Sequence, residues 1–372
     1  MTDKERVLDV ALLAPRGSLL VDGPQGGSSY VLEEDARILR EAGFRVTVWA
    51  PPGSTSALVT RTQGIRFRKP LLSSLEYCGH FVKANHGAVL LAYNEPTVAV
   101  LAPERTIVRF DWPTPLPRYA PWPVARRRFL RARYLFPSQA LRDLWLARHT
   151  FIPLDRTVVL ANAIDSKVWG PAPPPPEQPL RVGFAGQWVP EKGLQVLLSA
   201  WPEVEREVGS AELLLAGGPA LWQRTNPAPG ARELAERVTH MRSFHRIVVV
   251  GVMPRQGMPA FWRQVHVAAV PSVCAESFGL VALEAMACGR PIVASAVGAL
   301  PEVVGDAGIL VPPEDPVALA EALIGLLSDT RKREDLGTKA AARARMFSLE
   351  ERAKRLVELV REVARGANLR PC

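Results

Sequence analysis

Apolar runs of strand length alternate with helical apolar repeats along most of the chain. Residues 7–15 and 44–50 are predicted to form buried strands. Between them, a glycine-rich turn at 23–27 precedes residues 28–42, whose apolar positions recur at helical spacing. This strand–helix–strand order predicts a parallel sheet covered by helices, as in doubly wound α/β domains.

The same alternation resumes in the second half of the chain, after a proline-rich stretch. Strands are predicted at 180–185, 212–218, 246–251, 265–271 and 291–295. The stretch 170–179 reads G-P-A-P-P-P-P-E-Q-P, and such a proline run forms an extended, semi-rigid spacer that enters neither a helix nor a central strand. We therefore predict two α/β domains, at 1–169 and 180–347, separated by a linker at 170–179.

Length and composition agree with two globular domains. A chain of 372 residues is longer than a typical domain with a single hydrophobic core. Its composition, with 48% hydrophobic and 22% charged residues, is that of a globular and not of a disordered protein. The four cysteines (Cys78, Cys274, Cys288 and Cys372) form no C-x-x-C pair, so we expect reduced thiols and no zinc site. The start, M-T-D-K-E-R, lacks the apolar core of a signal peptide, and no apolar run reaches transmembrane length. We expect a cytoplasmic protein, at most peripheral to the inner face of the membrane.

Positive charge is concentrated in one part of the first domain. The formal net charge is +9, and ten arginines between Leu101 and Thr150 are balanced by only three acidic residues. Six of these arginines lie between Arg118 and Arg133, including the run R-R-R-F-L-R-A-R at 126–133. Such a cluster suits anionic lipid, nucleic acid or an acidic substrate. A solvated helix face is an equally good interpretation.

The stretch 274–289, C-A-E-S-F-G-L-V-A-L-E-A-M-A-C-G, carries the most chemical information. Glu276 and Glu284 lie eight residues apart, around a Ser-Phe-Gly break and an alanine-rich run. This pattern predicts a loop leading into a helix that begins between Phe278 and Leu280, with the final glycine as its stop. The free N–H groups of such a helix start attract phosphate. Carboxylates beside a phosphate must face uncharged groups such as sugar hydroxyls; the alternative is an ordinary turn with a solvated Glu284.

The longer string 276–295, E-S-F-G-L-V-A-L-E-A-M-A-C-G-R-P-I-V-A-S, resembles the E-x7-E signature of family 4 glycosyltransferases. This family consists of retaining nucleotide-sugar enzymes with the GT-B fold. The resemblance implies an α/β protein of two Rossmann-like domains whose parallel sheets face a central cleft, with the nucleotide sugar bound by the second domain. It also implies that a C-terminal helix, within 348–372, crosses back onto the first, acceptor-side domain.

The resemblance gives each candidate residue of the second domain a role. Lys192, in the segment G-Q-W-V-P-E-K-G, would neutralise the donor diphosphate, and Gln187 stands where an arginine is usual. Glu276 would hydrogen-bond the donor sugar, and Glu284 the ribose. The other donor-binding residues are Val252 and Met253, which would hold the nucleobase through the main chain, and Ser277, Phe278, Gly279 and Leu280 at the helix start.

The resemblance also covers two features of the first domain. Gly26 and Gly27 match the glycine pair that lies beside the donor diphosphate and the acceptor. In the loop that begins at Asp111, family members often carry a histidine that holds the donor sugar, and this chain has none. By position, Asp111 is the residue nearest to the absent histidine and could take its catalytic role. A role as the cap of a turn is equally consistent with its position. Arg16, Arg109 or another basic side chain could supply the positive charge that is missing because Gln187 replaces the usual arginine.

These features predict a retaining glycosyltransferase that moves a hexose-type sugar from a nucleoside-diphosphate sugar to an acceptor hydroxyl. A UDP sugar is expected from its frequency in the family, and the acceptor is a metabolite, a glycan or a lipid-linked sugar. No cofactor and no metal are expected, since no Asp-x-Asp element lies in a suitable loop.

Two alternatives stay open at this point. One is a non-catalytic relative that binds a nucleotide sugar, which the glutamine at 187 and the absent histidine favour. The other is a binder of anionic membrane or nucleic acid that uses the cluster from Arg126 to Arg133. A peripheral contact with anionic membrane is compatible with the enzyme, whereas nucleic acid is not an expected partner.

Overall fold

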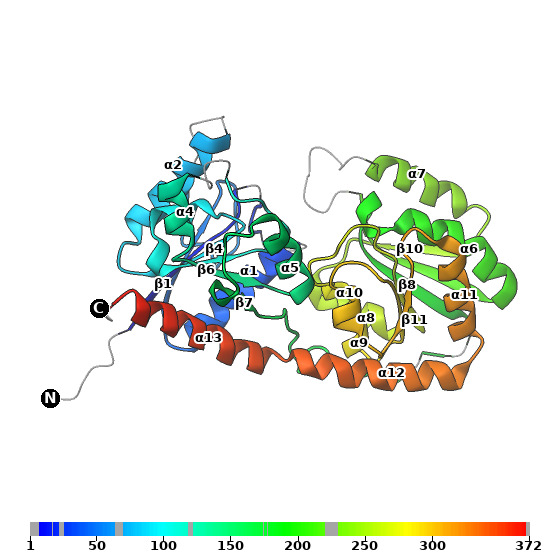
Figure 1. The fold of residues 1–372 in the computed structure, drawn as a ribbon. Helices are drawn as coiled ribbons and strands as arrows, with labels where there is room; N and C mark the ends of the chain where they lie inside the picture. Colours follow the sequence, from blue (N-terminus) through cyan, green and yellow to red (C-terminus); the bar gives the residue numbers. More distant parts are fainter. Residues whose placement is uncertain are drawn as a thin grey trace. The chain divides into compact units, whose positions relative to one another are not determined.

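The computed structural model describes residues 7–16, 18–21, 26–63, 70–117, 122–173, 175–176, 178–219 and 230–369. The chain forms two compact units (Figure 1). The first unit comprises the chain up to Asn162 together with the chain from Glu350 onward, and the second comprises Ala163–Leu349. Residues 1–6, part of the glycine-rich turn, Arg118 and Cys372 lie outside the described residues.

The first unit is a parallel sheet covered by helices. Its strands follow the order β3-β2-β1-β4-β5-β6-β7, and all neighbours pair in parallel. The strands are β1 (Asp9–Leu13), β2 (Arg45–Ala50), β3 (Arg61–Thr62), β4 (Val89–Tyr93), β5 (Thr106–Arg109), β6 (Arg133–Phe136) and β7 (Thr157–Val159). The helices are α1 (Gly27–Glu41), α2 (Pro70–Ala84), α3 (Thr97–Leu101), α4 (Pro123–Phe129), α5 (Gln139–Arg148) and α13 (Leu349–Gly366), with short 3-10 turns η1 (Pro103–Arg105) and η2 (Leu154–Arg156).

The second unit has the same architecture. Its strands follow the order β10-β9-β8-β11-β12-β13, again all parallel, so the predicted α/β class is confirmed. The strands are β8 (Leu180–Gln187), β9 (Ala211–Gly218), β10 (Ile247–Gly251), β11 (Val267–Val270), β12 (Ile292–Ser295) and β13 (Ile309–Val311). The helices are α6 (Leu194–Val208), α7 (Ala231–Met241), α8 (Met258–Arg263), α9 (Leu280–Ala287), α10 (Leu300–Val304), α11 (Pro316–Leu327) and α12 (Thr330–Ala344), with 3-10 turns η3 (Pro190–Lys192), η4 (Arg255–Gly257) and η5 (Arg345–Phe347).

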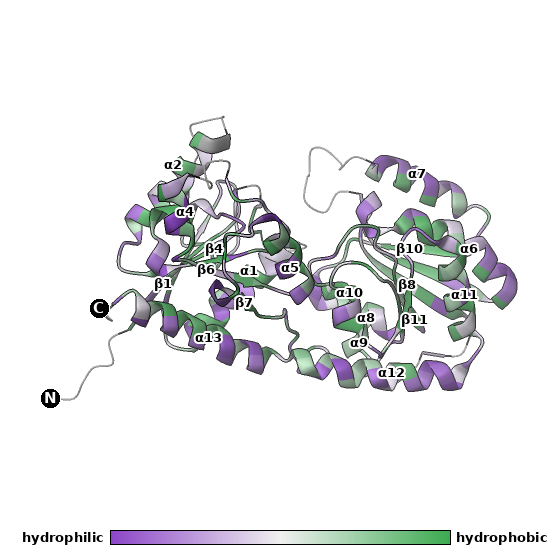
Figure 2. Ribbon diagram, viewed as in Figure 1, coloured by the Kyte–Doolittle hydropathy of each residue, from purple (hydrophilic) through white to green (hydrophobic). Residues whose placement is uncertain are grey.

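Each unit has its own apolar core. In the second unit, strand residues pack against α6 and α11 around the fully buried Trp201. In the first unit, Trp145 of α5 lies within 4.9 Å of the Phe110 ring and 5.2 Å of the Tyr134 ring, measured between centroids. Figure 2 shows apolar residues along the central strands and polar residues along the outer faces of the helices. This is the arrangement that buried parallel strands and amphipathic helices require.

Arg352 fastens the last helix to the first unit. Its buried side chain donates to the carbonyl oxygens of Leu160 at 3.3 Å and Ala161 at 2.7 Å, and it forms an ion pair with Asp35 of α1. Asp35 also accepts a hydrogen bond from the Tyr93 hydroxyl at 2.6 Å. A buried guanidinium is tolerated here because it is both paired and hydrogen-bonded. The C-terminal helix therefore belongs to the first unit, as the resemblance implied.

The boundary between the units lies closer to the N-terminus than predicted, since the first unit ends at Asn162 and not at residue 169. The N–H of Ile164 donates to the Phe347 carbonyl at 3.1 Å, which holds this segment on the second unit. Arg290 is buried and donates to the carbonyl oxygens of Ala172 at 2.6 Å and Pro173 at 3.0 Å. The first part of the proline-rich stretch is therefore hydrogen-bonded to the second unit, because its carbonyls accept from an arginine inside that unit.

The sequence gives little indication of α12, because its buried face consists mainly of small residues and not of large apolar side chains. The buried positions are Arg333, Gly337, Ala340, Ala341 and Ala344. Gly337 lies so close to the end of α9 that an added Cβ would be 2.5 Å from the carbonyl oxygen of Gly289. A face of glycine and alanine packs closely, but it lacks the regularly spaced large apolar residues by which most amphipathic helices are predicted.

Gly337→Ala should destabilise the second unit, whereas Gly325→Ala should stabilise it. A methyl group at residue 337 would press on a backbone carbonyl, and such overpacking costs about 1–3 kcal/mol. Gly325 lies inside α11 with nothing within 4 Å of its added Cβ, so alanine there should add about 0.5–1 kcal/mol. Urea unfolding followed by circular dichroism measures both changes. Equal effects of the two substitutions would contradict the close packing of α12.

Candidate functional site

The candidate site of the second unit lies where the order of the strands reverses. β9 and β10 lie on one side of β8, whereas β11, β12 and β13 lie on the other. The carboxyl ends of β8 and β11 are therefore neighbours at a switch point, the place where open α/β sheets bind their ligands. The loop after β8 carries Lys192, and the loop after β11 carries Glu276. Strand order thus brings together two residues that are distant in the sequence.

Lys192 and Glu276 form an ion pair. Lys192 Nζ donates to Glu276 Oε1 at 2.7 Å, and the hydroxyl of Ser272 donates to the same oxygen at 2.7 Å. The lysine side chain is 40% exposed and the glutamate side chain 15% exposed. The pair therefore lies at the boundary with solvent, where a ligand can replace either partner. The sequence predicts both residues as ligand contacts but indicates neither their mutual contact nor Ser272.

Two glycines allow the surrounding loops to approach each other. Gly298, after β12, has φ +58°, and an added Cβ would lie 2.4 Å from the backbone nitrogen of Glu276. Gly193, between η3 and α6, has φ +73°, and its Cβ would lie 1.7 Å from the carbonyl oxygen of Pro271. Both the left-handed conformation and the lack of space require glycine. The N–H of Ala299 then donates to the Glu276 carbonyl at 2.9 Å, which fixes the loop.

α9 begins within the predicted range, directly after this loop. Its first residue is Leu280, preceded by Gly279 in the left-handed conformation at φ +95°. Gly279, the N-cap residue, has no side chain that could accept a hydrogen bond from the first N–H groups, and a helix start of this kind attracts anions. Ser277 is half-buried. The Phe278 side chain is buried and packs edge-on against Phe347, with centroids 5.6 Å apart.

Glu284 is buried within α9 and is ion-paired. The residue is only 4% exposed, and Arg255 Nη1 lies 2.7 Å from its Oε1. Burial raises the pKa of the Glu284 carboxyl above its usual value, and the Arg255 guanidinium opposes that rise. Arg255 also lies over the Trp169 ring, 5.4 Å from its centroid. The interpretation of Glu284 as a solvated helix residue is therefore wrong, and its contact with ribose stays a prediction.

The other predicted donor-binding residues of this unit lie at the ends of neighbouring strands. Gln187 is the last residue of β8 and is in register with Gly218 of β9. Val252 and Met253 follow β10, and Val252 is exposed. A Cβ added at Gly218 would lie 3.2 Å from Val252 Cγ2, so this glycine lets the β10 loop lie against the end of β9. These residues therefore share the carboxyl edge of the sheet with Lys192.

Gly26, Gly27 and Asp111 belong to the first unit. The two glycines lie at the start of α1, with Gly26 buried and Gly27 exposed. Asp111 follows β5 and is buried; its carboxylate accepts from Arg109 Nε at 2.9 Å, and its N–H donates to Asn94 Oδ1 at 3.0 Å. Its second carboxylate oxygen has no partner among the described residues. The roles of all three toward the donor stay predictions.

Arg109 is engaged inside the first unit. Its side chain is completely buried and donates to Asp111 Oδ1 and to Asn162 Oδ1, so Asp111 offsets its charge there. Its role as a substitute for the arginine that Gln187 replaces stays a prediction. Arg16 donates through Nε to Glu95 Oε1 at 2.9 Å and through Nη1 to Ser73 at 2.7 Å. Burial raises the pKa of Glu95, an effect that Arg16 opposes. Glu95 is a single acidic residue after an apolar strand, and no pattern in the sequence predicts its contact with Arg16.

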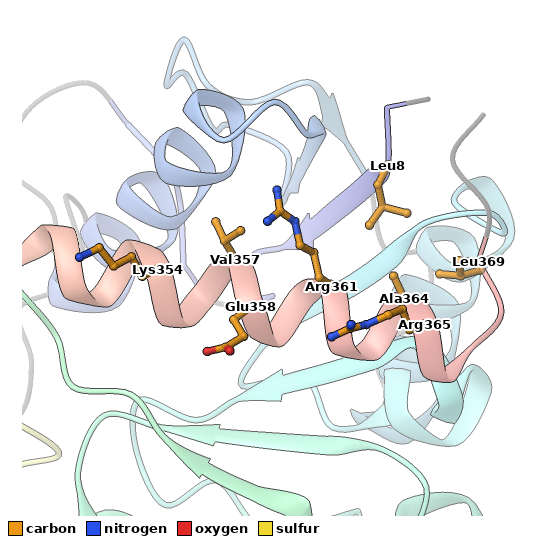
Figure 3. A pocket seen from close by; sticks show the side chains of 8 residues that line it. All are labelled: Leu8, Lys354, Val357, Glu358, Arg361, Ala364, Arg365 and Leu369. Atoms are coloured by element: carbon orange, nitrogen blue, oxygen red, sulfur yellow. The ribbon is translucent and has the colours of Figure 1, made fainter. Parts of the chain in front are cut away.

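A hollow along α13 coincides with none of these residues. Figure 3 shows it beside the last helix of the first unit. Its lining consists of Leu8, Lys354, Val357, Glu358, Arg361, Ala364, Arg365 and Leu369. Four of these residues are apolar and four are charged.

In the described part of the chain, no group of three or more His, Cys, Asp or Glu side chains is arranged to hold a metal ion. Every helix in the same part is too short or too polar to cross a bilayer. Cys78 and Cys288 are buried free thiols, and Cys274 is an exposed one.

The sequence of the second unit matches a known family. A model of the family described as "Glycosyl transferases group 1" matches residues 179–329, which include both loops of the candidate site and α9. The D-inositol 3-phosphate glycosyltransferase of Corynebacterium efficiens is 37% identical over 185 residues, 49% of this chain and 42% of that protein. Residues 179–329 are thereby assigned to the glycosyltransferases, and the resemblance to family 4 is confirmed over this part of the chain. A relative of the same name from Xylanimonas cellulosilytica is 34% identical over 224 residues, 55% of this chain and 51% of that protein, so the chain spans about half the length of these curated family members.

Solved structures share the fold over almost the whole chain. Sucrose-phosphate synthase from Thermosynechococcus elongatus has a TM-score of 0.76 at 21% identity, covering 96% of this chain and 99% of that one. Anabaena Alr3699/HepE, solved in complex with UDP and glucose, has a TM-score of 0.73 at 20% identity, covering 95% and 99%. The predicted GT-B fold is confirmed.

Arg255→Leu should destabilise the second unit near neutral pH, because it leaves the buried Glu284 carboxylate without its cation. Such a loss costs about 3 kcal/mol. The pKa of Glu284, already raised by burial, would rise further. A carboxyl whose folded pKa exceeds its unfolded pKa loses stability as pH rises between the two values, so the deficit should be smaller at acidic pH than at pH 7.

Urea unfolding at several pH values tests this expectation. The double variant Arg255→Leu/Glu284→Leu removes both charges and should recover most of the lost free energy. A single Arg255→Leu variant as stable as the parent at neutral pH would show that the ion pair does not support α9.

Proposed function

We propose that the chain is a retaining glycosyltransferase that transfers a hexose-type sugar from a nucleoside-diphosphate sugar to an acceptor hydroxyl. One observation carries this proposal: Lys192 contacts Glu276 at the switch point of the second sheet, and the loop that carries Glu276 leads directly into the start of α9. A cation beside free N–H groups suits a diphosphate, and a carboxylate next to them suits the hydroxyls of a sugar.

In this proposal the donor diphosphate lies at the start of α9, where it accepts from the N–H groups of Phe278, Gly279 and Leu280. Lys192 turns from Glu276 toward the leaving phosphate, and Glu276 then accepts hydrogen bonds from the sugar. Glu284 contacts the ribose, and the main chain at residues 252–253 contacts the base. Uridine is favoured by the Anabaena Alr3699/HepE structures, which were solved with UDP and with UDP-glucose.

The proposed chemistry needs a stabilised leaving group more than a protein base. The bond between the anomeric carbon and the diphosphate breaks while the acceptor oxygen attacks from the same face. A phosphate oxygen of the departing diphosphate takes the acceptor proton, so the products are the glycosylated acceptor and a nucleoside diphosphate. Lys192 offsets the charge that develops on the leaving group, and it carries a larger share because Gln187 is neutral.

The acceptor is proposed to be a hydroxyl of a metabolite, a glycan or a lipid-linked sugar. The curated relatives named D-inositol 3-phosphate glycosyltransferase favour a small phosphorylated polyol among these. The second candidate function is a non-catalytic nucleotide-sugar binder, which Gln187 in place of an arginine supports. Release of nucleoside diphosphate from a panel of donors and acceptors distinguishes the two, since a binder would retain the donor unchanged.

Glu276→Ala should lower the transfer rate by about 10²–10³-fold, because it removes the group that orients the sugar at the charged centre. The measurement is nucleoside-diphosphate release with the best donor of the panel. Glu191→Ala is the matched control: its side chain is exposed, next to Lys192, and its removal should leave the rate unchanged. Unaltered turnover of the Glu276 variant, with the fold intact by circular dichroism, would refute the site.

Removal of divalent cations should leave the transfer rate unchanged, because Lys192 and the N–H groups of α9 supply the positive polarity at the diphosphate. Nucleoside-diphosphate release is measured before and after dialysis against EDTA. Activity that disappears and returns on addition of Mg²⁺ would contradict this part of the proposal.

A further inference from the structure

The five arginines from Arg126 to Arg133 separate into two groups. Arg131 forms an ion pair with Glu104 at 2.7 Å, and Arg133 donates to the carbonyl oxygen of Asp155 at 2.9 Å. The remaining three arginines (Arg126, Arg127 and Arg128) lie consecutively on α4, and all three are exposed. None of them is paired with a carboxylate of the described residues.

The two partly engaged members of this triplet contact only neutral groups. Arg126 lies over the Phe151 ring, 5.2 Å from its centroid, and Arg128 Nη1 donates to the carbonyl oxygen of Val100 at 2.8 Å. Neither contact neutralises the charge. Three consecutive exposed arginines on one turn therefore carry positive charge that no carboxylate of the described residues offsets, and such charge attracts an anionic partner and repels a cationic one.

Exposed apolar side chains adjoin this charge. Trp122, at the start of α4, is 69% exposed, and Val124, in its first turn, is 71% exposed. Residues three and four apart on a helix are neighbours, so Trp122 adjoins Arg126, and Val124 adjoins both Arg127 and Arg128. We call this set, Trp122, Val124, Arg126, Arg127 and Arg128, the α4 patch. Exposed apolar side chains that lie together are unfavourable in water, so a tryptophan and a valine beside three arginines indicate an interaction site.

We propose that the α4 patch binds the surface of an anionic lipid bilayer. Tryptophan prefers the headgroup region, an aliphatic side chain gains by entering the acyl boundary, and arginines attract anionic headgroups. A nucleic acid would use the arginines and could stack on Trp122, but it offers nothing to Val124. The combination of all three kinds of side chain therefore favours lipid.

The α4 patch belongs to the first unit, whereas Lys192 and Glu276 belong to the second. The proposal therefore does not depend on the proposed function, and membrane binding can be measured without any sugar donor. A membrane-bound enzyme would meet its acceptor at the bilayer surface, and a membrane-bound binding protein would hold its nucleotide sugar there.

Flotation of the full chain with vesicles tests the proposal. Vesicles of phosphatidylcholine alone are compared with vesicles of phosphatidylcholine mixed with phosphatidylglycerol, at low and high salt. We expect binding to the mixed vesicles that weakens with salt. Arg126→Gln/Arg127→Gln/Arg128→Gln should lower the partition coefficient by about tenfold or more, and Trp122→Ala/Val124→Ser should lower it even at low salt.

Two matched controls separate the α4 patch from net charge and from general hydrophobicity. Arg331→Gln/Lys332→Gln/Arg345→Gln removes three exposed positive charges elsewhere, and Phe244→Ala removes an exposed aromatic side chain elsewhere. Both should bind vesicles like the parent. The proposal is overturned if these controls lose as much binding as the α4 variants, if neutral vesicles bind equally well, or if the patch binds a single-stranded oligonucleotide but no vesicle.

Discussion

The candidate site depends on the close approach of two loops at the carboxyl ends of β8 and β11. The N–H of Val273 donates to the carbonyl of Glu191 at 3.0 Å, and the Lys192–Glu276 pair lies beside this bond. The approach is possible only because Gly193 has no Cβ to collide with the chain at Pro271. Parallel pairing of β8 with β11 fixes where the loops begin, so strand order and one glycine together determine the distance between the two charges.

The parts of the site that were predictable from sequence are those with a local cause. The start of α9 follows from a glycine break before helix-forming residues, and Lys192 is marked by the glycine that follows it. The Arg255–Glu284 pair has no local cause, since it depends on how η4 packs near α9 after the β10 edge strand. The contact of Ser272 with Glu276 was not predictable for the same reason, because a serine after a strand occurs in many structural roles.

The fold shows the same difference between local and tertiary causes. Most strands were predictable because buried parallel strands are continuous apolar runs, and Asp315 with Pro316 marks the start of α11. The boundary between the units was not predictable, because the carbonyls at Ala172 and Pro173 bind an arginine more than a hundred positions further along the chain. A proline run indicates an extended backbone, but its sequence does not say what that backbone contacts.

Burial decides which charged residues are left for a ligand. In the first unit, Arg109 is offset by Asp111 and Arg352 by Asp35, so these charges serve the fold. The sequence alone does not distinguish an arginine whose charge is buried and paired from one whose charge is exposed. The α4 arginines and Lys192 keep exposed surface, and this separates them from the structural pairs more sharply than any motif does.

Charge balance in the proposed donor site bears on how a donor would bind. Before binding, Lys192 neutralises Glu276 and Arg255 neutralises Glu284. A diphosphate that takes Lys192 as its partner leaves the Glu276 carboxylate close to another anion and in need of hydrogen-bond donors. Sugar hydroxyls supply those donors, whereas a nucleoside diphosphate without sugar does not. In the proposed mechanism, the complete nucleotide sugar would therefore satisfy both sides of the broken ion pair, whereas the free diphosphate would satisfy only one. This difference would favour release of the product after transfer of the sugar.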